Sequence, residues 1–214
     1  MKLDIIISDR RHPLWSVVSA WTQQHPEHQV RLLQKLAEAD GGDCLVLLAC
    51  QQIARLEVRS RYGQCLVTHA SDLPEGRGWS PAVWDVLQGK DRLVLALIEA
   101  ADPVDAGRIF RKFRAPLQPT DLHDDISRVL GQLVIEALDF VLQYPDAKPV
   151  AQKGEPSWYR RRTPEDSRLD PAQSIASQFN LMRVCDPERY PAFFELHGER
   201  FELIVRKASK VHSP

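Results

Sequence analysis

The stretch that decides the fold is "LVTHASDLPEGRGWSPAVW", which runs from Leu66 to Trp84. An apolar run typical of a buried strand ends at His69, and a loop rich in proline and glycine follows it. The chain then restarts at Ser80, which is suited to cap a helix, and Pro81, which is suited to its first position. This succession of strand, loop and helix places a titratable ring where a strand ends.

Three further runs share the apolar character of residues 65–70 and alternate with helical or loop segments. They are residues 3–8, 43–50 and 92–100. Continuous apolar runs are expected of strands covered on both faces of a parallel sheet. The sequence therefore predicts an α/β fold with a mainly parallel sheet.

Helices are predicted where apolar side chains recur at helical spacing. The first follows Pro13, the second covers residues 81–88 and ends at Gly89, and the third covers residues 121–143. The third has one continuous apolar stripe and is the clearest long helix in the chain.

The composition changes between residues 144 and 170, where prolines and alternating charges lack any sustained period. We expect an extended ordered loop or a linker there, after a main domain at residues 1–143. The remainder, residues 171–214, is expected to form a C-terminal helix and β-hairpin subdomain.

Two local signals define that C-terminal part. Asp170 and Pro171 offer a helix start, with Ile175 and Phe179 on one side of the helix. The end, "AFFELHGERFELIVRKA", is typical of two short strands that turn at its His-Gly pair.

Composition and charge limit the possible partners. The 214 residues are 43% hydrophobic and 27% charged, which is typical of a soluble globular protein. The formal net charge is −1 with acids and bases interspersed, so we expect no long nucleic acid as a partner. The sequence contains neither an apolar run of about 18 residues nor a signal peptide, so we expect a cytoplasmic protein with no membrane contact.

The four cysteines show no CxxC spacing, and we expect them to be reduced. They are Cys44, Cys50, Cys65 and Cys185. Burial as small hydrophobic side chains is the favoured role, with a place near the active site as the alternative for Cys65. No cluster of Cys, His and acidic residues has ligand spacing, so no metal site is predicted.

An acidic loop, "EAADPVDAGRIF" at residues 99–110, follows the strand predicted at residues 92–100. If neighbouring strands carry both loops, Asp105 can lie beside His69 and supply a carboxylate that orients the ring. Spacing alone leaves the alternatives open that His69 is structural and that Asp105 only caps a turn.

Arginine and aromatic residues occur together in two loops. Arg77 and Trp79 lie in the glycine-bearing loop after His69, and Trp158 and Tyr159 precede three consecutive arginines. Such a group can stack on a base and hold a pyrophosphate. A solvated loop with paired acids remains the alternative.

Taken together, "HASDLPEGRGWSP", "VDAGRIF" and "FNLMRVCDPERYPAFFELHGERFELIV" resemble the formyltransferase family that uses 10-formyltetrahydrofolate. The likeness is to its short members, similar to the methionyl-tRNA and sugar N-formyltransferases. It implies a Rossmann-like α/β fold with a mainly parallel sheet and a small C-terminal β-hairpin. It also implies that residues 1–143 are the catalytic domain, with His69 and Asp105 as an acid/base pair.

One position departs from the family pattern, because Val67 stands where the family usually has an Asn two positions before the His. Another polar group can replace it, the enzyme can work without it, or the chain is a degenerate homologue. The replacements considered are Cys65, Thr68, Gln64, Gln51 and Gln52.

The resemblance also implies where ligands bind. The pterin of the donor would lie between the loop after "LVLLAC" and the "EAADPVD" loop, and its expected neighbours are Cys50, Gln51, Gln52, Ala101 and Asp102. The acceptor is expected to be a primary amine of a small molecule, best matched by a nucleotide-linked amino sugar. Its expected neighbours are Arg77, Gly78, Trp79, Ser80, Trp158, Tyr159 and Arg160.

Two rival functions remain open at this point. One is a methionyl-tRNA formyltransferase-like activity, and the other is a non-catalytic homologue that binds folate or a protein. A homodimer is a further expectation, because an exposed hairpin edge can pair across a twofold axis. The alternative is that the hairpin packs on its own domain.

Overall fold

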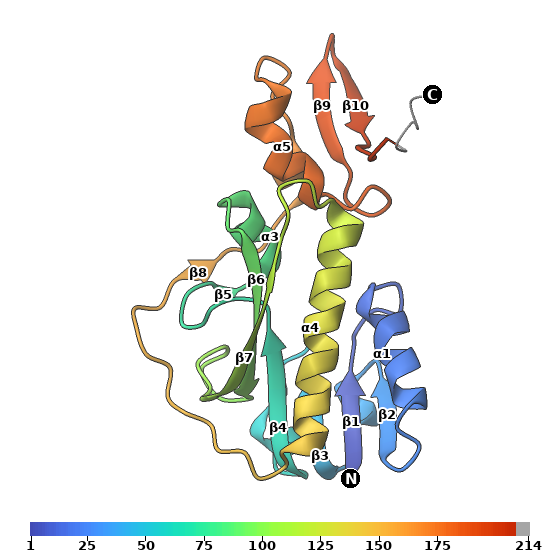
Figure 1. The fold of residues 1–214 in the computed structure, drawn as a ribbon, viewed down its shortest axis with the longest axis vertical. Helices are drawn as coiled ribbons and strands as arrows, with labels where there is room; N and C mark the ends of the chain where they lie inside the picture. Colours follow the sequence, from blue (N-terminus) through green and yellow to red (C-terminus); the bar gives the residue numbers. More distant parts are fainter. Residues whose placement is uncertain (209–214) are drawn as a thin grey trace, which may run out of the picture.

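A computed structural model describes residues 1–208 of the chain. Within them, the main sheet has six strands in the order β2-β1-β3-β4-β6-β7 (Figure 1). The strands are β1 (Lys2–Ile6), β2 (Gln29–Leu33), β3 (Gly42–Leu47), β4 (Tyr62–His69), β6 (Arg92–Glu99) and β7 (Ile109–Pro116). The first four in chain order pair in parallel, whereas β6 is antiparallel to both of its neighbours.

The helices cover the sheet unevenly. They are α1 (Leu14–Gln23), α2 (Leu56–Arg59), α3 (Pro81–Leu87), α4 (His123–Gln143) and α5 (Ile175–Val184), with short 3₁₀ turns at Leu36–Glu38 and Pro164–Ser167. The apolar stripe of α4 packs with α1 against one face of the sheet. A smaller cluster that includes Ile6, Leu45 and Tyr62 fills the other face.

The predicted strands and helices are present, with two corrections to the sheet. The run at residues 92–100 forms β6, but it is antiparallel, because an apolar run reports burial on both faces and not strand direction. Strands β2 and β7 were not predicted. In β7, "IFRKFRAP" mixes basic and apolar residues, which hid its pairing with β6.

Two predicted helix starts are also wrong in detail. Ser80 precedes α3 with a φ of 50°, in the left-handed region, and its side chain makes no capping hydrogen bond. A capping serine normally has an extended backbone, which aims its hydroxyl at the first turn. Helix α5 begins at Ile175 and not at Pro171, because Ser174 accepts the capping bond from the Ser177 N–H. Ile175 is therefore at the first turn and is 73% exposed.

Residues 145–163, which we call the strap, run in an extended path along the outer side of the sheet (Figure 1). Val150 forms an isolated bridge with Ile109 at the start of β7. Further along, β8 (Trp158–Tyr159) pairs in parallel with β5 (Arg77–Gly78). The segment expected to be a loop or a linker is therefore attached to the main domain at both of these places.

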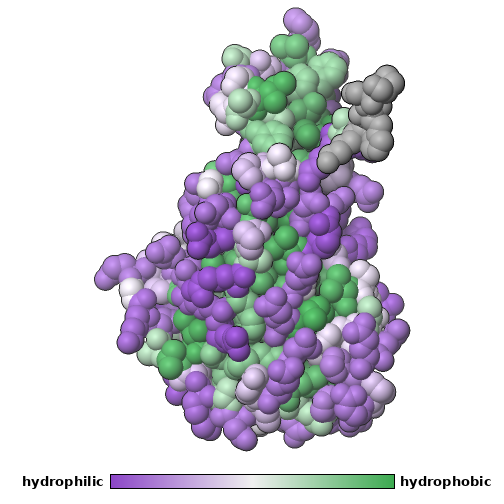
Figure 2. Space-filling view, viewed as in Figure 1, coloured by the Kyte–Doolittle hydropathy of each residue, from purple (hydrophilic) through white to green (hydrophobic). Residues whose placement is uncertain are grey.

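The C-terminal part lies beyond the upper end of α4 (Figure 1). Its strands β9 (Ala192–Leu196) and β10 (Glu199–Leu203) form the predicted antiparallel hairpin. Buried Arg183 of α5 donates to the carbonyl of Gln118, which ties this part to the connection before α4. Figure 2 shows hydrophobic side chains gathered over this end. The predicted subdomain extends to residue 214, and its last six positions, 209–214, lie outside the described residues.

Among residues 1–208, none of the helices has the length and apolar character needed to cross a bilayer.

Candidate active site

His69 is the last residue of β4, and its side chain is almost completely enclosed. The residue is 6% exposed. Its Nε2 lies 2.8 Å from the carbonyl oxygen of Gly76, in the loop that follows the strand. Because side chains alternate along a strand, Val67 and Cys65 share the face of His69, whereas Thr68 and Gln64 lie on the other face.

Asp105 lies in the connection between β6 and β7, and the structure brings it to the other side of the imidazole. Its Oδ1 is 3.4 Å from Nδ1 of His69, and the two side chains are 10% and 7% exposed, respectively. Its Oδ2 accepts a hydrogen bond of 2.9 Å from the Gly78 N–H. The ring thus faces an oxygen atom at each nitrogen, the Gly76 carbonyl at Nε2 and the Asp105 carboxylate at Nδ1.

The loop between His69 and α3 is fixed by hydrogen bonds within it and by contacts with β7. The Ser71 hydroxyl donates to the Glu75 carbonyl at 2.8 Å. The Lys112 ammonium on β7 pairs with Asp72 and donates to the Leu73 carbonyl at 2.6 Å. These bonds hold the Gly76 carbonyl in place over the imidazole.

Two strap residues contribute to the site and were missed by the sequence analysis. The Gln152 amide donates to the carbonyls of Asp105 and Gly107 at 2.8 and 2.9 Å. The Ser157 hydroxyl accepts from the Gly76 N–H at 2.9 Å. No local pattern distinguishes these side chains, because their partners are 45 to 81 residues away in the chain.

The two loops expected to border a pterin lie on either side of β4. The Ala100 N–H donates to the Cys65 carbonyl at 2.8 Å, which places the start of the acidic loop beside β4. Leu47 pairs with Val67, so the loop after β3 begins at the opposite side of the same strand. Cys50, Cys65, Val67 and Ala100 are partly buried and pack against the apolar cluster that fills this face of the sheet.

The residues expected to border the pterin make different hydrogen bonds and ion pairs within the protein. Gln51 is exposed, with its N–H bonded to the Ser8 hydroxyl, and the Gln52 side chain accepts from the Leu36 N–H at 2.7 Å. Asp102 forms an ion pair with Arg59, whose guanidinium also donates to the Ala100 carbonyl, next to Ala101.

The structure also distinguishes among the residues proposed to replace the missing Asn. Cys65 alone of Cys65, Thr68 and Gln64 lies on the face of His69. The Gln64 amide donates to the Pro145 carbonyl at 2.8 Å, and the Gln52 carbonyl is bonded to Leu36. Burial raises the pKa of the Cys65 thiol to about 12, so this side chain is a neutral thiol at pH 7.

The aromatic and arginine residues of the two loops meet beside the β5–β8 pair. The Arg77 guanidinium lies 5.7 Å from the Trp158 ring, and the Arg161 guanidinium lies 4.9 Å from the Trp79 ring. Trp158 and Trp79 are 65% and 46% exposed. Their rings therefore offer flat apolar surfaces next to positive charge, beside the loop that follows His69.

The other residues expected at this surface are less available. The Arg160 guanidinium donates two hydrogen bonds to the Asp166 carboxylate. This pairing agrees with the alternative interpretation, a solvated loop with paired acids. The Tyr159 hydroxyl faces inward and donates to buried Asp85 at 2.7 Å. Burial and the adjacent carboxylate raise the pKa of Tyr159. Gly78 gives its N–H to Asp105, and Ser80 is exposed at the turn before α3.

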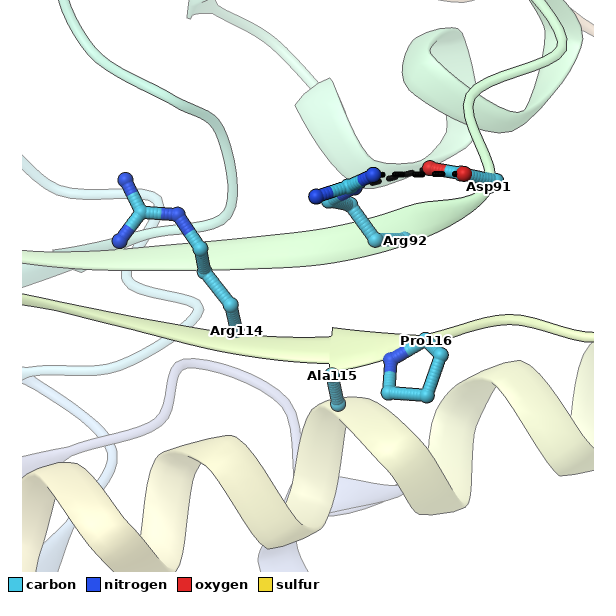
Figure 3. A pocket seen from close by; sticks show the side chains of 5 residues that line it. All are labelled: Asp91, Arg92, Arg114, Ala115 and Pro116. Carbon is cyan, nitrogen blue, oxygen red and sulfur yellow. Dashed lines mark hydrogen bonds and ion pairs between the residues drawn. The ribbon is translucent and has the colours of Figure 1, made fainter.

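A separate hollow of about 280 Å³ lies at the other end of the β6–β7 pair. Its lining residues are Asp91, Arg92, Arg114, Ala115 and Pro116 (Figure 3). They come from the start of β6 and the end of β7, whereas the loop with Asp105 joins the opposite ends of these strands. Among residues 1–208, no group of three or more His, Cys, Asp and Glu side chains is arranged to hold a metal ion.

A scan against protein-family models finds no match for this chain. Among curated proteins, the methionyl-tRNA formyltransferase of Geobacillus thermodenitrificans is 33% identical over 134 residues, which cover 59% of this chain and 41% of that protein. The chain spans about half the length of the curated relatives it matches.

Solved structures share the fold at lower identity. A methionyl-tRNA formyltransferase from Clostridium thermocellum superposes with a TM-score of 0.81 at 20% identity, covering 98% of this chain and 94% of that one. HypX from Aquifex aeolicus in complex with tetrahydrofolic acid gives 0.76 at 20% identity, covering 96% and 37%. A sugar N-formyltransferase from a Shewanella species gives 0.72 at 15% identity, covering 98% and 99%. The expected α/β fold, with its mainly parallel sheet and C-terminal hairpin, is confirmed.

Proposed function

The homologues and structural neighbours of this chain are formyltransferases, and on that basis we propose that it transfers a formyl group from 10-formyltetrahydrofolate to a primary amine. The acceptor that we propose is a nucleotide-linked amino sugar. The observation that carries the proposal is the enclosed contact between His69 and Asp105, 3.4 Å apart where two loops meet.

In this reaction, the neutral amine attacks the formyl carbon and negative charge develops on the formyl oxygen. When the tetrahedral intermediate collapses, the bond between the formyl carbon and the folate nitrogen breaks, and that nitrogen takes up the proton lost by the amine. A positioned donor aimed at such an oxygen is worth about 3 kcal/mol of transition-state stabilisation. His69 supplies that donor through Nε2, which lies 2.8 Å from the Gly76 carbonyl oxygen. The formyl oxygen must therefore replace that carbonyl as the acceptor.

Asp105 has two roles in the proposal. Its carboxylate holds the imidazole at Nδ1, and it receives the proton that leaves the attacking nitrogen, directly or through a water. General acid or base assistance of this kind contributes roughly 100- to 10,000-fold in rate. The Gly78 N–H fixes the carboxylate at the required side of the ring.

The residues present suit the folate donor. The partly buried side chains of Cys50, Cys65 and Val67, which pack against one cluster of the core, offer apolar surface beside these loops. The loops that flank it include exposed residues such as Gln51 and Asp102, and their peptide groups can pair with the amide-like edge of a pterin. The tetrahydrofolate complex of HypX, which shares this fold, supports the assignment.

The surface argues for a small acceptor. Trp79 and Trp158 can stack on a base, and Arg77 and Arg161 lie against their rings. The Arg161 guanidinium can bind a pyrophosphate, whereas that of Arg77 is bonded to Gln152. The formal net charge of −1 provides no extended positive field for a transfer RNA.

A panel of acceptors tests the proposal. Purified protein is incubated with 10-formyltetrahydrofolate and either nucleotide-linked amino sugars or initiator methionyl-tRNA, and products are identified by mass spectrometry. We expect formylation of at least one sugar nucleotide, with kcat reduced roughly 100- to 10,000-fold in His69→Ala. Formylation of the transfer RNA alone would reject the acceptor. Equal, near-background rates in both proteins would favour a non-catalytic binding module.

The second candidate function is a methionyl-tRNA formyltransferase-like activity, which is favoured because the curated relatives are methionyl-tRNA formyltransferases. Filter binding of transfer RNA at increasing salt separates the two functions. An enzyme that neutralises several phosphates shows a steep loss of affinity with salt. We expect weak binding with a shallow slope.

A further inference from the structure

Gln152 on the strap is bonded through both atoms of its amide. Nε2 donates to the carbonyl of Asp105 at 2.8 Å and to the carbonyl of Gly107 at 2.9 Å. Oε1 accepts from the Arg77 guanidinium at 2.6 Å. The amide orientation follows from these partners, since carbonyls can only accept and a guanidinium can only donate.

The residue that it holds has an unusual backbone. Asp105 has a φ of +60°, a conformation that costs a residue other than glycine on the order of 1 kcal/mol or more. Such a conformation persists where surrounding contacts impose it. The amide of Gln152 lies on the carbonyl of this same residue, and the Gly78 N–H lies on its carboxylate.

The second bond of Gln152 extends this restraint to the end of the loop. At Gly107, an added Cβ would lie 1.9 Å from the Glu99 carbonyl oxygen, so the backbone passes directly against the end of β6. The Gln152 amide thus binds the backbone carbonyls on both sides of Ala106. This fixes the turn from which the Asp105 side chain projects toward His69.

We propose that Gln152 is a positioning residue, which holds the Asp105 carboxylate against Nδ1 of His69 by fixing the backbone that carries it. The inference rests on the proposed function for its catalytic consequence. It also gives the strap a role in the site, because the side chain that orders the Asp105 loop belongs to a segment far from it in the chain. Arg77, which stacks on Trp158, in turn holds the Gln152 amide.

Two variants and a matched control test the role. Gln152→Ala removes the amide, and Gln152→Glu keeps its size and the acceptor for Arg77 but replaces the donor. Gln64→Ala is the control, because it also removes one amide bond to the strap, to the Pro145 carbonyl, from the face of β4 opposite His69. Thermal unfolding of each variant shows whether it is folded at the assay temperature.

In both Gln152 variants, we expect kcat to fall about 10- to 100-fold. The KM for the formyl donor should change less than about threefold, because misplacement of a catalytic group affects the chemical step more than substrate binding. In an Asp105→Ala background, the further loss caused by Gln152→Ala should be absent, because the residue acts through Asp105. Gln64→Ala should retain the parental kcat.

Hydrogen exchange supplies a readout that requires no catalysis. The Gly78 N–H is bonded to the Asp105 carboxylate, so release of this loop should accelerate its exchange at least about tenfold in Gln152→Ala and Gln152→Glu, but not in Gln64→Ala. Unchanged exchange at Gly78, or a kcat loss no larger than in the control, overturns the proposal. If the parent protein transfers no formyl group, the proposed function fails while the exchange data still decide whether Gln152 holds the loop.

Discussion

At the scale of single residues, the site depends on buried side chains bonded to the backbone or to one another. Asp85 is 1% exposed, and its Oδ1 accepts from the Tyr159 hydroxyl at 2.7 Å and pairs with Lys90 at 2.8 Å. A Cβ added at Gly76 would lie 2.7 Å from the Tyr159 ring. The ring therefore packs directly against the loop that covers His69. Tyr159 is therefore an anchor for the strap.

Tyr159→Phe tests that anchor. Removal of the hydroxyl leaves the buried Asp85 carboxylate without one of its donors, so we expect the free energy of unfolding to fall by about 1–3 kcal/mol. Urea denaturation followed by fluorescence measures it. Tyr144→Phe is the control, because Tyr144 is 54% exposed and its change should stay within about 0.5 kcal/mol of the parent. A similar loss in both variants would contradict the anchoring role.

At the scale of elements, the pairing of β5 with β8 requires close approach of two backbones. Gly78 has a φ of +99°, and an added Cβ would lie 2.4 Å from the Tyr159 carbonyl oxygen. The bonds on either side of it, from Arg77 to Ser157 and from Trp79 to Tyr159, hold the two short strands together. A side chain at Gly78 would therefore separate β5 from β8.

Gly78→Ala is expected to lower the free energy of unfolding by more than about 3 kcal/mol, since it combines backbone strain with a clash that only backbone movement relieves. Gly198→Ala in the C-terminal hairpin is the matched control. Gly198 has a φ of +82° but nothing within 4 Å of its added Cβ, so only the strain of about 1–2 kcal/mol applies. Chemical denaturation compares the two, and equal losses would show that the close approach at Gly78 is relaxed.

The start of α4 holds a carboxylate whose protonation affects the stability of the fold. The Asp125 carboxylate accepts from the Leu122 N–H at 3.2 Å and pairs with Lys207 at 2.6 Å and with Arg128 at 2.5 Å. These partners, Lys207 first, lower the pKa of Asp125 below its ordinary value. The carboxylate therefore stabilises the folded state above the unfolded-state pKa, and this contribution is lost as the pH falls through the folded-state pKa.

Asp125→Asn should consequently lower stability by about 1 kcal/mol at pH 7. The difference from the parent should shrink below about pH 4 as the carboxyl group becomes protonated in the unfolded and then in the folded state. Urea denaturation at a series of pH values measures it. A difference that is constant from pH 7 to pH 3 would contradict the assignment.

At the scale of the whole molecule, the strap joins parts that the sheet leaves separate. It contacts the start of β7 through Val150, the Asp105 loop through Gln152 and the His69 loop through Ser157. Both halves of the proposed active site are thus bonded to one segment. We expect the strap to resist proteases although most of its side chains are exposed.

Trypsin digestion tests this arrangement, because the strap contains Lys153 and the arginines at 160–162. Cleavage there should be slow in the parent and at least about tenfold faster in Gly78→Ala, in which β8 loses its partner strand. Cleavage after Arg206, beyond the hairpin, is the internal reference and should not change. Rapid cleavage at Lys153 in the parent would show that the strap is not held against the domain.

The sequence by itself determined the features that depend on neighbouring residues. The apolar run that ends at His69, the long helix α4 and the turn at His197 and Gly198 follow from periodicity and turn chemistry within about 20 residues. The tertiary structure decided the direction of β6, the place of β7 in the sheet, the path of the strap and the contact of Gln152 with Asp105. These features depend on pairing between segments that are distant in the chain, and an amide in an irregular segment has the same local appearance whether it faces solvent or holds a carbonyl 47 residues away.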